Sequence, residues 1–553
     1  MTQLSLLPIA TKSCPVGPMT GAPRPAFTSA ARFALGLLFL LFVGVRFSHA
    51  QYADLYEFGG AIPCCKGYPA AMAQGRDGNL YGITTSGGDH SLGSIYKLTT
   101  TGTVTQLYSF DGPHGSTPMG GLMLAPDGNL WGTTEEGGAH GFGTIFKISA
   151  AGVFTDVYDF TASTDGGFPV SPLIVGSDGN LYGTSHPGVM YKISTAGVFK
   201  AVAKTPSESY GALLLASDGS YYGVTEFAGT ITDGTVYKVT GATTTVLFNF
   251  DGPHGAFPVG GLAQGADGNI YGTTTAGGTS NDGVIFKITP SGAFSVVFNF
   301  DHTLQFAQGY QPWSGLITGS DGSLYGTTIW GGANGNGVIY EWSTGGAYSV
   351  LYSFDGPTGV GAYATPVEHT NGEIFGFTAR GGAVGDGVIY GFQAALPRYA
   401  LLNQPNGTVG RSIGILGNGF STASSVTFNG TPASFHVISN TYMTATVPSG
   451  ETGFVTVATS SGTLTSNRLF KVTPQITSFS PTSGKVGDSV VITGAGLIQA
   501  ATVKIGGVKV LSYTVNSDAQ LTIKVPTGAK TGKIVVVTPG GSVTAQGTFT
   551  VTP

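Results

Sequence analysis

The sequence predicts an all-β fold: a seven-bladed β-propeller followed by two small β-sandwich domains. The first observation is a hexapeptide, DGNLYG in its commonest form, that returns seven times between Asp77 and Asn371. The steps between copies are 50, 51, 40, 49, 54 and 50 residues, and such a period with strand-like alternation is typical of propeller blades. The second observation is a change at Pro397, where this period stops and two copies of ~78 residues begin, a length suited to small sandwiches.

Turn chemistry divides each repeat into four strands, as the second repeat illustrates. Asp127-Gly128 is a tight hairpin signal, because Gly readily adopts positive φ and Asp tolerates it better than most residues. This hairpin explains why the aspartate recurs, and the motif lacks further carboxylates at calcium-ligand spacing. The strands expected in this repeat are Gly121–Pro126, Asn129–Thr134, Thr144–Ser149 and Val153–Phe160.

Residues 1–50 predict a secretory signal peptide that is cleaved after Ala50. They contain four basic residues and no Asp or Glu, with an apolar run of 13 residues from Phe33 to Val45. That run is shorter than the ~20 residues that span a membrane. Ser48-His49-Ala50 places small residues where signal peptidase requires them. An uncleaved anchor and a start at Met19 are the alternatives. With cleavage, we expect a secreted or cell-surface protein without a membrane span.

Composition narrows the classes of partner. Without residues 1–50 the chain carries 20 Lys and Arg against 29 Asp and Glu, a net charge of −9. Charged residues make up 10% of the chain and form no basic run, so nucleic-acid binding is not expected. Beyond Cys14, the cysteines are the adjacent pair Cys64 and Cys65. Adjacent residues can form only a strained vicinal disulfide, so two incidental thiols are favoured over a redox site.

Seven outer-strand copies match the seven hairpins, but the two sets are offset along the chain. The first outer-strand copy, Leu55 to Phe58, precedes any hairpin, and no outer strand follows the last blade. We therefore expect Tyr52–Phe58 to pair with Val388–Phe392 and to close a ring over residues 51–396. Closure pairs the strand edge that would otherwise stay free between the first and last blades. Every ring of blades must avoid such an unpaired edge.

The lengths of the connections separate the two faces of the propeller. Turns between first and second strands and between third and fourth strands are tight, whereas the other connections are long. In an up-and-down blade both long connections lie on one face, and long loops on a rigid scaffold are where binding groups usually sit. Segments of the Asp-Gly-Pro-His type recur among these loops, which favours structural turns over histidine ligands.

Residues that occur in one blade only are the better candidates for ligand binding, because a feature shared by most blades serves the blade. Exposed Trp on loops suits stacking on sugar rings or aromatic ligands. Each candidate also has a plainer interpretation as a packing or solvated residue at a blade edge. No catalytic residue, metal site or cofactor is predicted. The candidate ligand-binding residues are Glu135, Glu136, Glu226, Trp313, Trp330 and Arg380.

The two copies that follow the repeats share a set of motifs. VVITGAGL from Val490 in the second copy corresponds to ILGNGF from Ile415 in the first, and both copies contain Val-Pro and end on a Phe-Lys-Val-Thr-Pro or Phe-Thr-Val-Thr-Pro segment. These motifs resemble the IPT/TIG family of immunoglobulin-like β-sandwich domains, over residues 397–473 and 474–553. The first copy departs at its opening, where YALL from Tyr399 replaces the usual strand. The resemblance implies spacers or modules that bind proteins or glycans.

The repeat region resembles a family as well. GGLxxxxDGNLYGTTxxGG, followed by GVIFKI and VLFNFDG, is similar to the tandem GloVer repeats of bacterial choice-of-anchor exported proteins, over about residues 53–392. This resemblance implies export and surface display, and no defined activity comes with it. The hairpin motif is also similar to streptogramin-lyase and sensor-regulator propellers. No lyase site is carried over, because no His/Glu metal set matches residue by residue.

Two classes of function stay open. The first is a non-enzymatic binding or adhesion protein whose loop face recognises an extracellular glycan or protein, with the sandwiches as stalk or second binding module. The second is a secreted lyase or glycoside hydrolase acting on extracellular polysaccharide. Glycoside hydrolysis needs two convergent carboxylates ~5–10 Å apart, whereas Glu135 and Glu136 point apart in an extended backbone. Nucleophile-elbow and zincin motifs are missing, so the sequence favours binding.

Overall fold

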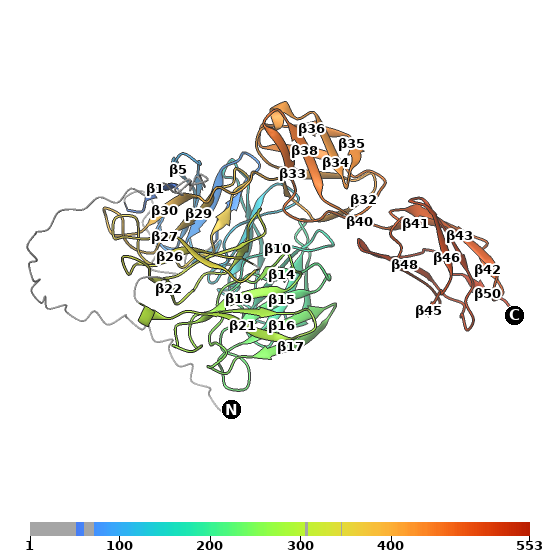
Figure 1. The fold of residues 1–553 in the computed structure, drawn as a ribbon, viewed down its shortest axis with the longest axis horizontal. Coiled ribbons are helices and arrows are strands. Elements are labelled where there is room, and N and C mark those ends of the chain that lie inside the picture. The colour runs from blue at the N-terminus through green and yellow to red at the C-terminus, as the bar shows by residue number, and fades with distance from the viewer. Residues whose placement is uncertain (1–50, 60–70, 305–307, 344) are drawn as a thin grey trace, which may run out of the picture. The chain divides into compact units, whose positions relative to one another are not determined.

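The computed structural model describes residues 51–59, 71–304, 308–343 and 345–553. Within these residues helix is limited to two 3₁₀ turns, η1 (His302–Leu304) and η2 (Phe420–Thr422). Residues 51–393 contain seven four-stranded sheets, and residues 401–551 contain the sheets of two sandwiches (Figure 1). The expected all-β fold, a propeller followed by sandwich domains, is confirmed. The signal-peptide prediction, Cys14, Cys64 and Cys65 lie outside the described residues.

Each four-stranded sheet of the propeller is one blade, numbered here in chain order, and all pairings within a blade are antiparallel. From the inner to the outer edge, blades 1 to 3 consist of β2 (Ala73–Gln74), β3 (Leu80–Thr84), β4 (Ser94–Leu98) and β5 (Val104–Ser109); β6 (Met123–Leu124), β7 (Leu130–Thr134), β8 (Thr144–Ile148) and β9 (Phe154–Asp159); and β10 (Ile174–Val175), β11 (Leu181–Ser185), β12 (Val189–Ile193) and β13 (Phe199–Lys204). Blades 4 and 5 consist of β14 (Leu214–Leu215), β15 (Tyr221–Thr225), β16 (Thr235–Thr240) and β17 (Thr243–Asn249); and β18 (Ala263–Gln264), β19 (Ile270–Thr274), β20 (Val284–Ile288) and β21 (Phe294–Asn299). Blades 6 and 7 consist of β23 (Ile317–Thr318), β24 (Leu324–Thr327), β26 (Val338–Trp342) and β27 (Tyr348–Ser353); and β28 (Val367–Glu368), β29 (Ile374–Phe377), β30 (Val388–Gln393) and β1 (Gln51–Glu57).

The recurring aspartate locks the hairpin between the first and second strands of a blade. In blade 1, Asp77 accepts hydrogen bonds from the Asn79 backbone N–H at 3.2 Å and from the Tyr81 hydroxyl at 2.8 Å. The aromatic residue four positions after the aspartate donates the same bond in blades 2 to 6, through the Trp131 indole N–H or a tyrosine hydroxyl. The side chains of the motif therefore satisfy one another, which supports the interpretation of these aspartates as turn residues.

The glycine after the motif aromatic residue makes room for the third strand. In blade 2, Gly132 is paired with Phe146, and a Cβ atom on Gly132 would lie 2.6 Å from the Phe146 ring. Such an approach is closer than side chains tolerate, so the position requires a residue without a side chain. β7 and β8 are buried almost throughout, because neighbouring blades cover both faces of the sheet.

Stacked aromatic rings join the outer strands of neighbouring blades. Tyr108 stacks on Phe154 with 3.8 Å between ring centroids, and the same contact joins blades 2 and 3, blades 4 and 5, and blades 5 and 6. The ring closes as predicted, because β1 pairs antiparallel with β30 and places Tyr52 opposite Phe392. Tyr52 also stacks on Tyr352 of blade 6, with 4.1 Å between centroids. The N-terminal strand thus completes blade 7 and packs on blade 6.

Small residues bring the blades into backbone contact around the propeller axis. A Cβ atom on Gly260, before β18, would lie 2.5 Å from the backbone nitrogen of Gly315, before β23. The Gly315 N–H in turn donates to Thr365 Oγ1 at 2.9 Å. This constriction is named the axial ring here. The inner strands next to it are short, and β6 covers only part of the expected Gly121–Pro126 strand. The members of the axial ring are Gly120, Ser171, Gly211, Gly260, Gly315 and Thr365.

The two sandwiches have the same strand order. Each consists of two four-stranded antiparallel sheets and a short parallel pair, β32 with β40 in the first sandwich and β42 with β50 in the second. Alternating apolar residues, such as Ile413 and Ile415 or Val490 and Ile492, fill the two cores. The strands of the first sandwich are β31 (Leu401–Leu402), β32 (Asn406–Thr408), β33 (Ser412–Leu416), β34 (Ser425–Phe428), β35 (Thr431–Ala433), β36 (Phe435–Val437), β37 (Tyr442–Thr446), β38 (Val455–Thr459), β39 (Gly462–Thr465) and β40 (Lys471–Thr473). Those of the second are β41 (Gln475–Ser480), β42 (Ser483–Gly484), β43 (Ser489–Ala495), β44 (Thr502–Ile505), β45 (Val508–Lys509), β46 (Tyr513–Ser517), β47 (Gln520–Lys524), β48 (Ile534–Thr538), β49 (Gly541–Thr544) and β50 (Thr550–Val551).

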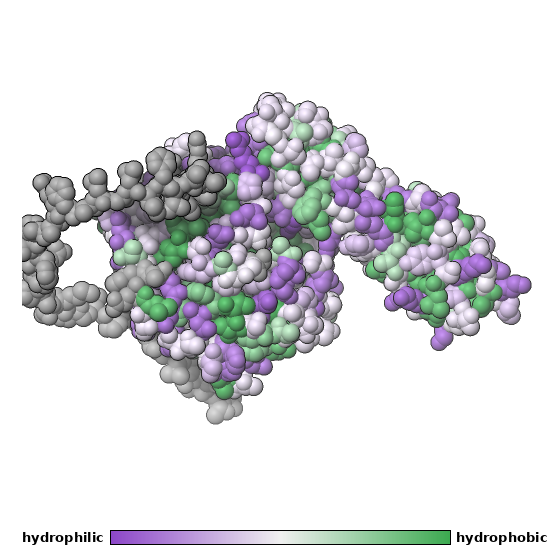
Figure 2. All heavy atoms as spheres, viewed as in Figure 1, coloured by the Kyte–Doolittle hydropathy of each residue, from purple (hydrophilic) through white to green (hydrophobic). Residues whose placement is uncertain are grey.

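The first sandwich is hydrogen-bonded to the face of the propeller that carries the Asp-Gly turns, named the turn face here. Asn403 Nδ2 donates to the Ala125 carbonyl at 3.2 Å, and Lys471 Nζ donates to the Ser217 carbonyl at 2.8 Å. Similar bonds reach the turns of blades 1, 3, 6 and 7. The repeated hairpins therefore serve as a docking surface for the next domain. On the visible surface, hydrophobic and hydrophilic side chains are intermixed (Figure 2).

Candidate functional site

The long connections of the propeller form a second face, named the loop face here. The loop between the second and third strands of blade 2 bridges the connection that enters the blade, since the Glu136 and Ser116 backbones exchange hydrogen bonds of 2.8 and 3.2 Å. The same backbone pairing between the loop and the entering connection recurs at Ala276, Trp330 and Arg380. Both kinds of long connection thus lie on one face, as the sequence predicted, and hydrogen bonds hold them together.

One position of the loop face changes its chemistry from blade to blade. It follows the Thr or Ser at the end of the second strand. Charged or titratable side chains occupy it in three consecutive blades, whereas the other four blades fold in the same way with neutral residues. The position is therefore free to serve a ligand. Its occupants in blades 1 to 7 are Thr85, Glu135, His186, Glu226, Thr275, Ile329 and Ala379.

Glu208, in the connection that enters blade 4, joins two candidate carboxylates into one electrostatic group. Burial, with the charges of Glu136 and Glu208, raises the pKa of Glu135. Burial, with the charge of Glu208, raises the pKa of Glu226 to about 7. His186 Nδ1 is bonded to Glu208 Oε2. Glu135, Glu208 and Glu226, named the acidic group here, can accept hydrogen bonds when ionised and donate them when protonated.

Two aromatic side chains lie next to the axial ring. Trp313 and Tyr363 meet edge to face, with 5.7 Å between ring centroids and 71° between ring planes, and both are half-buried. Each precedes its axial-ring residue, Gly315 or Thr365, by two positions, and the chain enters these segments from the loop face. The aromatic pair therefore lies on the loop side of the constriction. Aromatic faces in such a position suit stacking on a ligand ring.

The remaining candidates are not members of the acidic group, although the charge of Glu136 acts on the neighbouring Glu135. Trp330 is half-buried in β25 (Trp330–Gly331), which pairs with β22 (Gly309–Tyr310). Arg380 and Glu136 are exposed on their loops. Within the part of the chain that the structure describes, neither Trp330 nor Arg380 makes a side-chain hydrogen bond, ion pair or ring contact with the acidic group. The structure thus groups Glu135 and Glu226 with Glu208, leaves Glu136 outside this group next to Glu135, pairs Trp313 with Tyr363, and leaves Trp330 and Arg380 separate.

Three residues of this face escaped the sequence analysis: His186, Glu208 and Tyr363. His186 occupies the same repeat position as Glu135 and Glu226, so a comparison of the repeats position by position would have revealed it. Glu208 lies in the repeat whose motifs are only 40 residues apart, where the repeats are hardest to align. Its proximity to carboxylates of other blades arises only from the closed ring.

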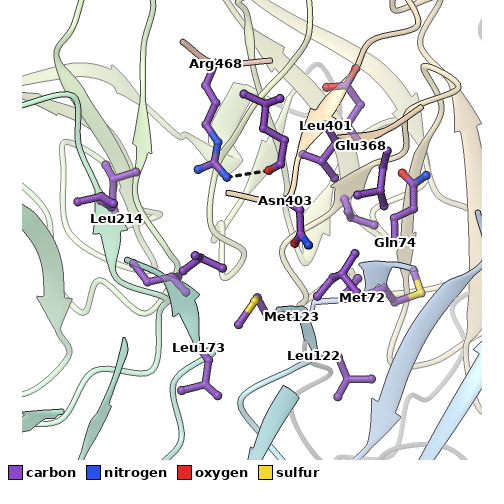
Figure 3. A pocket seen from close by; sticks show the side chains of 18 of the residues that line it. Met72, Gln74, Leu122, Met123, Leu173, Leu214, Glu368, Leu401, Asn403 and Arg468 are labelled. Atoms are coloured by element: carbon purple, nitrogen blue, oxygen red, sulfur yellow. Dashed lines mark hydrogen bonds between the residues drawn. The ribbon is translucent and has the colours of Figure 1, made fainter. Parts of the chain in front are cut away.

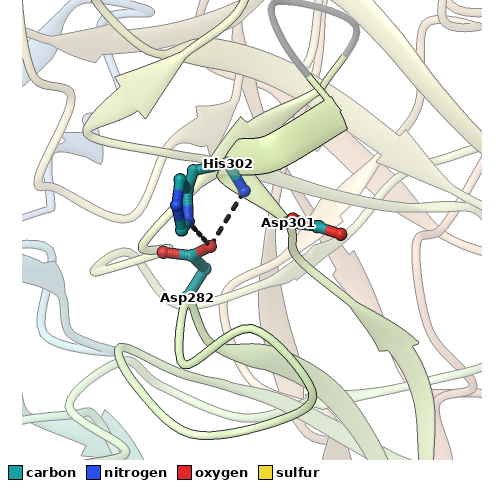
Figure 4. Close-up of side chains that lie close together, drawn as sticks. All are labelled: Asp282, Asp301 and His302. Carbon is teal, nitrogen blue, oxygen red and sulfur yellow. Dashed lines mark hydrogen bonds and ion pairs between the residues drawn. The ribbon is translucent and has the colours of Figure 1, made fainter.

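Asp282, Asp301 and His302 form a further cluster on the loops of blade 5 (Figure 4). Each offers a possible ligand atom within 4.8 Å of the others. Asp282 Oδ2 already accepts the His302 backbone N–H at 2.8 Å and contacts His302 Nδ1 at 2.5 Å. His114 and His254 each make a similar contact, of 2.8 Å, with the aspartate three residues earlier. We interpret these His–Asp pairs as locks of the loops, because their hydrogen-bonding groups satisfy one another.

The structure is a propeller of tandem repeats that is joined to sandwich domains, and the side chains of its loop face differ between blades. These features place the chain in the class of repeat-propeller scaffolds. Within this class, the chain belongs to the Gloeobacter/Verrucomicrobia repeat family, whose profile matches residues 45–207 and 209–441. The IPT/TIG domain profile matches residues 474–551, the second sandwich. The first sandwich shares its strand order. A search of curated proteins found no match to the chain.

Several solved structures are similar to parts of the chain. A luciferin-regenerating enzyme is 12% identical over 63% of this chain and 97% of its own, with a TM-score of 0.36. A putative oxidoreductase (glucose dehydrogenase) from Thermus thermophilus is 15% identical over 62% of this chain and 99% of its own, with a TM-score of 0.34. A surface glycan-binding protein from Prevotella bryantii is 22% identical over 26% of this chain, with a TM-score of 0.21, and the match spans 38% of that protein's length.

One structural feature bears on membranes. Among the described residues, no helix is long and apolar enough to cross a lipid bilayer.

Proposed function

We propose that this protein is an exported, non-enzymatic binding protein that recognises a glycan on the loop face of its propeller. The observation that carries the proposal is the contrast between the faces. The first sandwich is hydrogen-bonded to the turn face, whereas the loop face carries the side chains that differ between blades. In this proposal the glycan therefore engages the loop face.

The chemistry of the loop face favours a polyhydroxylated ligand. Trp313 and Tyr363 offer aromatic surface for the apolar face of a sugar ring. The acidic group offers carboxylate oxygens, which accept hydrogen bonds from sugar hydroxyls. A net charge of −9 without residues 1–50, with no basic cluster, argues against nucleic acid. Apolar surface combined with a few convergent polar groups is the usual composition of a small-ligand site.

The rest of the chain supports a role outside the cytoplasm. In this proposal residues 1–50 act as the export signal and are removed, and the mature protein is secreted or displayed on the cell surface. The sandwiches, with proposed boundaries 397–473 and 474–553, act as a stalk or as a second binding module. One residue, Pro474, separates β40 from β41, so the proposal includes a stiff connection between them.

A glycan-array screen with the full mature chain, followed by calorimetry with the best ligand, tests the proposal. Trp313→Ala and Glu226→Gln should each weaken binding about tenfold or more, because aromatic stacking and charged hydrogen bonds are typically worth ~1–3 kcal/mol. Glu341→Gln, on β26, is the matched control and should leave affinity unchanged. A ligand that binds the Trp313 and Glu226 variants as tightly as the parent protein would refute the loop-face site. Failure to bind any array glycan would refute the ligand class.

Hydrolysis of a glycan is the second candidate, favoured by one observation. The pKa of Glu226 is raised to about 7, as a general acid requires, and Glu135 and Glu208 supply further carboxylates. Release of reducing ends from a bound glycan, abolished by Glu226→Gln, would favour this candidate. Binding without turnover over prolonged incubation would favour the non-enzymatic proposal.

A further inference from the structure

A cavity lies on the side of the axial ring that faces the first sandwich. Its volume is about 370 Å³, and it is lined by segments of five blades and by the first sandwich (Figure 3). Pockets that hold small ligands usually measure roughly 300–1,000 Å³. The backbone contacts of the axial ring separate it from the aromatic pair. This cavity is therefore distinct from the proposed glycan site.

Most residues that line the cavity are apolar, and most of these come from the propeller. Met72, Met123, Leu173 and Leu214 belong to segments of blades 1 to 4 and surround its centre (Figure 3). Such a wall favours a hydrocarbon group, because burying apolar surface is worth about 25 cal/mol per Å².

The polar end of the cavity comes from the sandwich. Arg468 is an exposed residue overall, and its side chain contributes to the lining of the cavity. Its Nη2 donates to the Leu402 carbonyl at 3.2 Å, and within the described chain it has no carboxylate partner. Asn403 is 8% exposed and donates through Nδ2 to the Ala125 carbonyl, but its Oδ1 has no hydrogen-bond partner. A guanidinium and an unsatisfied amide oxygen thus lie beside an apolar hollow.

The other polar residues of the lining do not neutralise Arg468. Glu368 accepts hydrogen bonds from the Ser320 backbone N–H and hydroxyl, and burial raises its pKa to about 7. Gln74 exchanges hydrogen bonds with the Thr370 backbone N–H and hydroxyl. Arg468 therefore contributes an uncompensated positive charge to a largely apolar space.

We propose that this cavity binds a small amphipathic monoanion, with a hydrocarbon group among the inner strands and a carboxylate on the Arg468 guanidinium. Arginine matches carboxylate geometry and remains charged at neutral pH. A hydroxyl or amide N–H on the ligand would satisfy Asn403 Oδ1. Because both domains form the cavity, the bound molecule strengthens the contact between the first sandwich and the turn face.

Octanoate is the probe, measured by titration calorimetry on the full mature chain, with 1-octanol and octylammonium as matched neutral and cationic controls. We expect saturable binding of one octanoate per chain, at least about tenfold tighter than 1-octanol, because a hydrogen bond between charged groups is lost with the alcohol. Octylammonium should not bind. No saturable octanoate binding, or equal affinity for all three probes, overturns the proposal.

Two variants locate the binding. Arg468→Gln should reduce octanoate affinity to that of 1-octanol, whereas Arg411→Gln, at an arginine of the same sandwich that does not line the cavity, should change nothing. Leu214→Trp should fill the cavity and abolish binding of both probes while the protein still unfolds cooperatively. If Arg468→Gln does not fold, the Leu214→Trp result decides. Unchanged octanoate binding in a folded Arg468→Gln or Leu214→Trp protein overturns the site.

Discussion

The two faces of the propeller are built from the same repeats but follow opposite rules. On the turn face, aspartates at equivalent positions make equivalent hydrogen bonds in six blades. On the loop face, the position after the second strand holds Thr, Glu, His, Ile or Ala, and only its backbone surroundings are shared. Uniform residues thus occur where the structure needs them, and varied residues occur where the fold tolerates any side chain.

This difference separates stability from recognition. The turn face is held by its own hairpins and by the first sandwich, so substitutions there should cost folding energy. The loop face is held by backbone bridges, so substitutions there should spare the fold and affect binding. The following experiments test this division, beginning with the largest expected effect.

Trp131 should give the largest effect on folding stability, and its contrast with Trp330 on the loop face is the widest. Trp131 is fully buried between blades and donates to Asp127, so Trp131→Ala should destabilise the protein by about 3–5 kcal/mol, measured by urea unfolding of the full chain. Trp131→Tyr is the control and should cost much less, because tyrosine occupies this position in other blades. A small effect of Trp131→Ala would contradict the assignment of the motif to the core.

Asp267 tests the hairpin lock of the turn face. It accepts hydrogen bonds from Asn269 and from the Tyr271 hydroxyl, so Asp267→Ala should cost about 1–2 kcal/mol. Burial alone would raise the pKa of Asp267, but these hydrogen bonds outweigh it and lower the pKa below 3.8. Its stabilisation is therefore present above the unfolded pKa and lost as pH falls through the folded one.

The cost of Asp267→Ala should accordingly shrink in unfolding experiments below about pH 3, whereas it should stay constant from about pH 5 to 8. Glu136→Ala, on the loop face, is the matched control and should change stability by less than about 0.5 kcal/mol. Equal costs for the two variants would remove the distinction between the faces.

Glu226 tests the acidic group through the pH dependence of stability. Its pKa is about 7 in the folded protein against 4.5 for the free group, so the fold favours the protonated form. The corresponding stabilisation is complete below pH 4.5 and is lost as pH rises through 7. Glu226→Gln should therefore raise stability by about 1–2 kcal/mol at about pH 8, after allowance for solvent screening, and leave it unchanged at about pH 4.

Unfolding curves of both proteins at several pH values measure this effect. A gain that is the same in acidic and in mildly alkaline buffer would show that the carboxylate of Glu226 is not the titrating group.

Substitution of Trp330 should affect folding less than substitution of Trp131, Asp267 or Glu226. It is half-buried, and other blades place smaller residues at its position, so Trp330→Ala should cost less than about 1 kcal/mol. If it serves as a rim contact for the ligand, affinity should fall on the same preparation. A large loss of stability would make Trp330 a packing residue, and unchanged affinity would remove it from the binding face.

The sequence by itself determined the blade and the closure of the ring. Hairpin chemistry, apolar alternation and the offset of the outer strands are local or periodic signals, and each constrains the backbone directly. β1 accordingly pairs with β30 as predicted, and both long connections lie on one face. The sequence also showed that the tryptophan at position 313 occurs in a single blade, because the repeats can be compared with one another.

Only the tertiary structure decided which residues meet. Glu208 approaches Glu135 and Glu226 because the ring brings consecutive blades together at its centre, and no spacing in the chain encodes that proximity. The same holds for Arg468, which reaches the inner strands only because the first sandwich is hydrogen-bonded to the turn face. Local pattern specifies strands and turns, whereas contacts between distant segments depend on packing that the pattern does not contain.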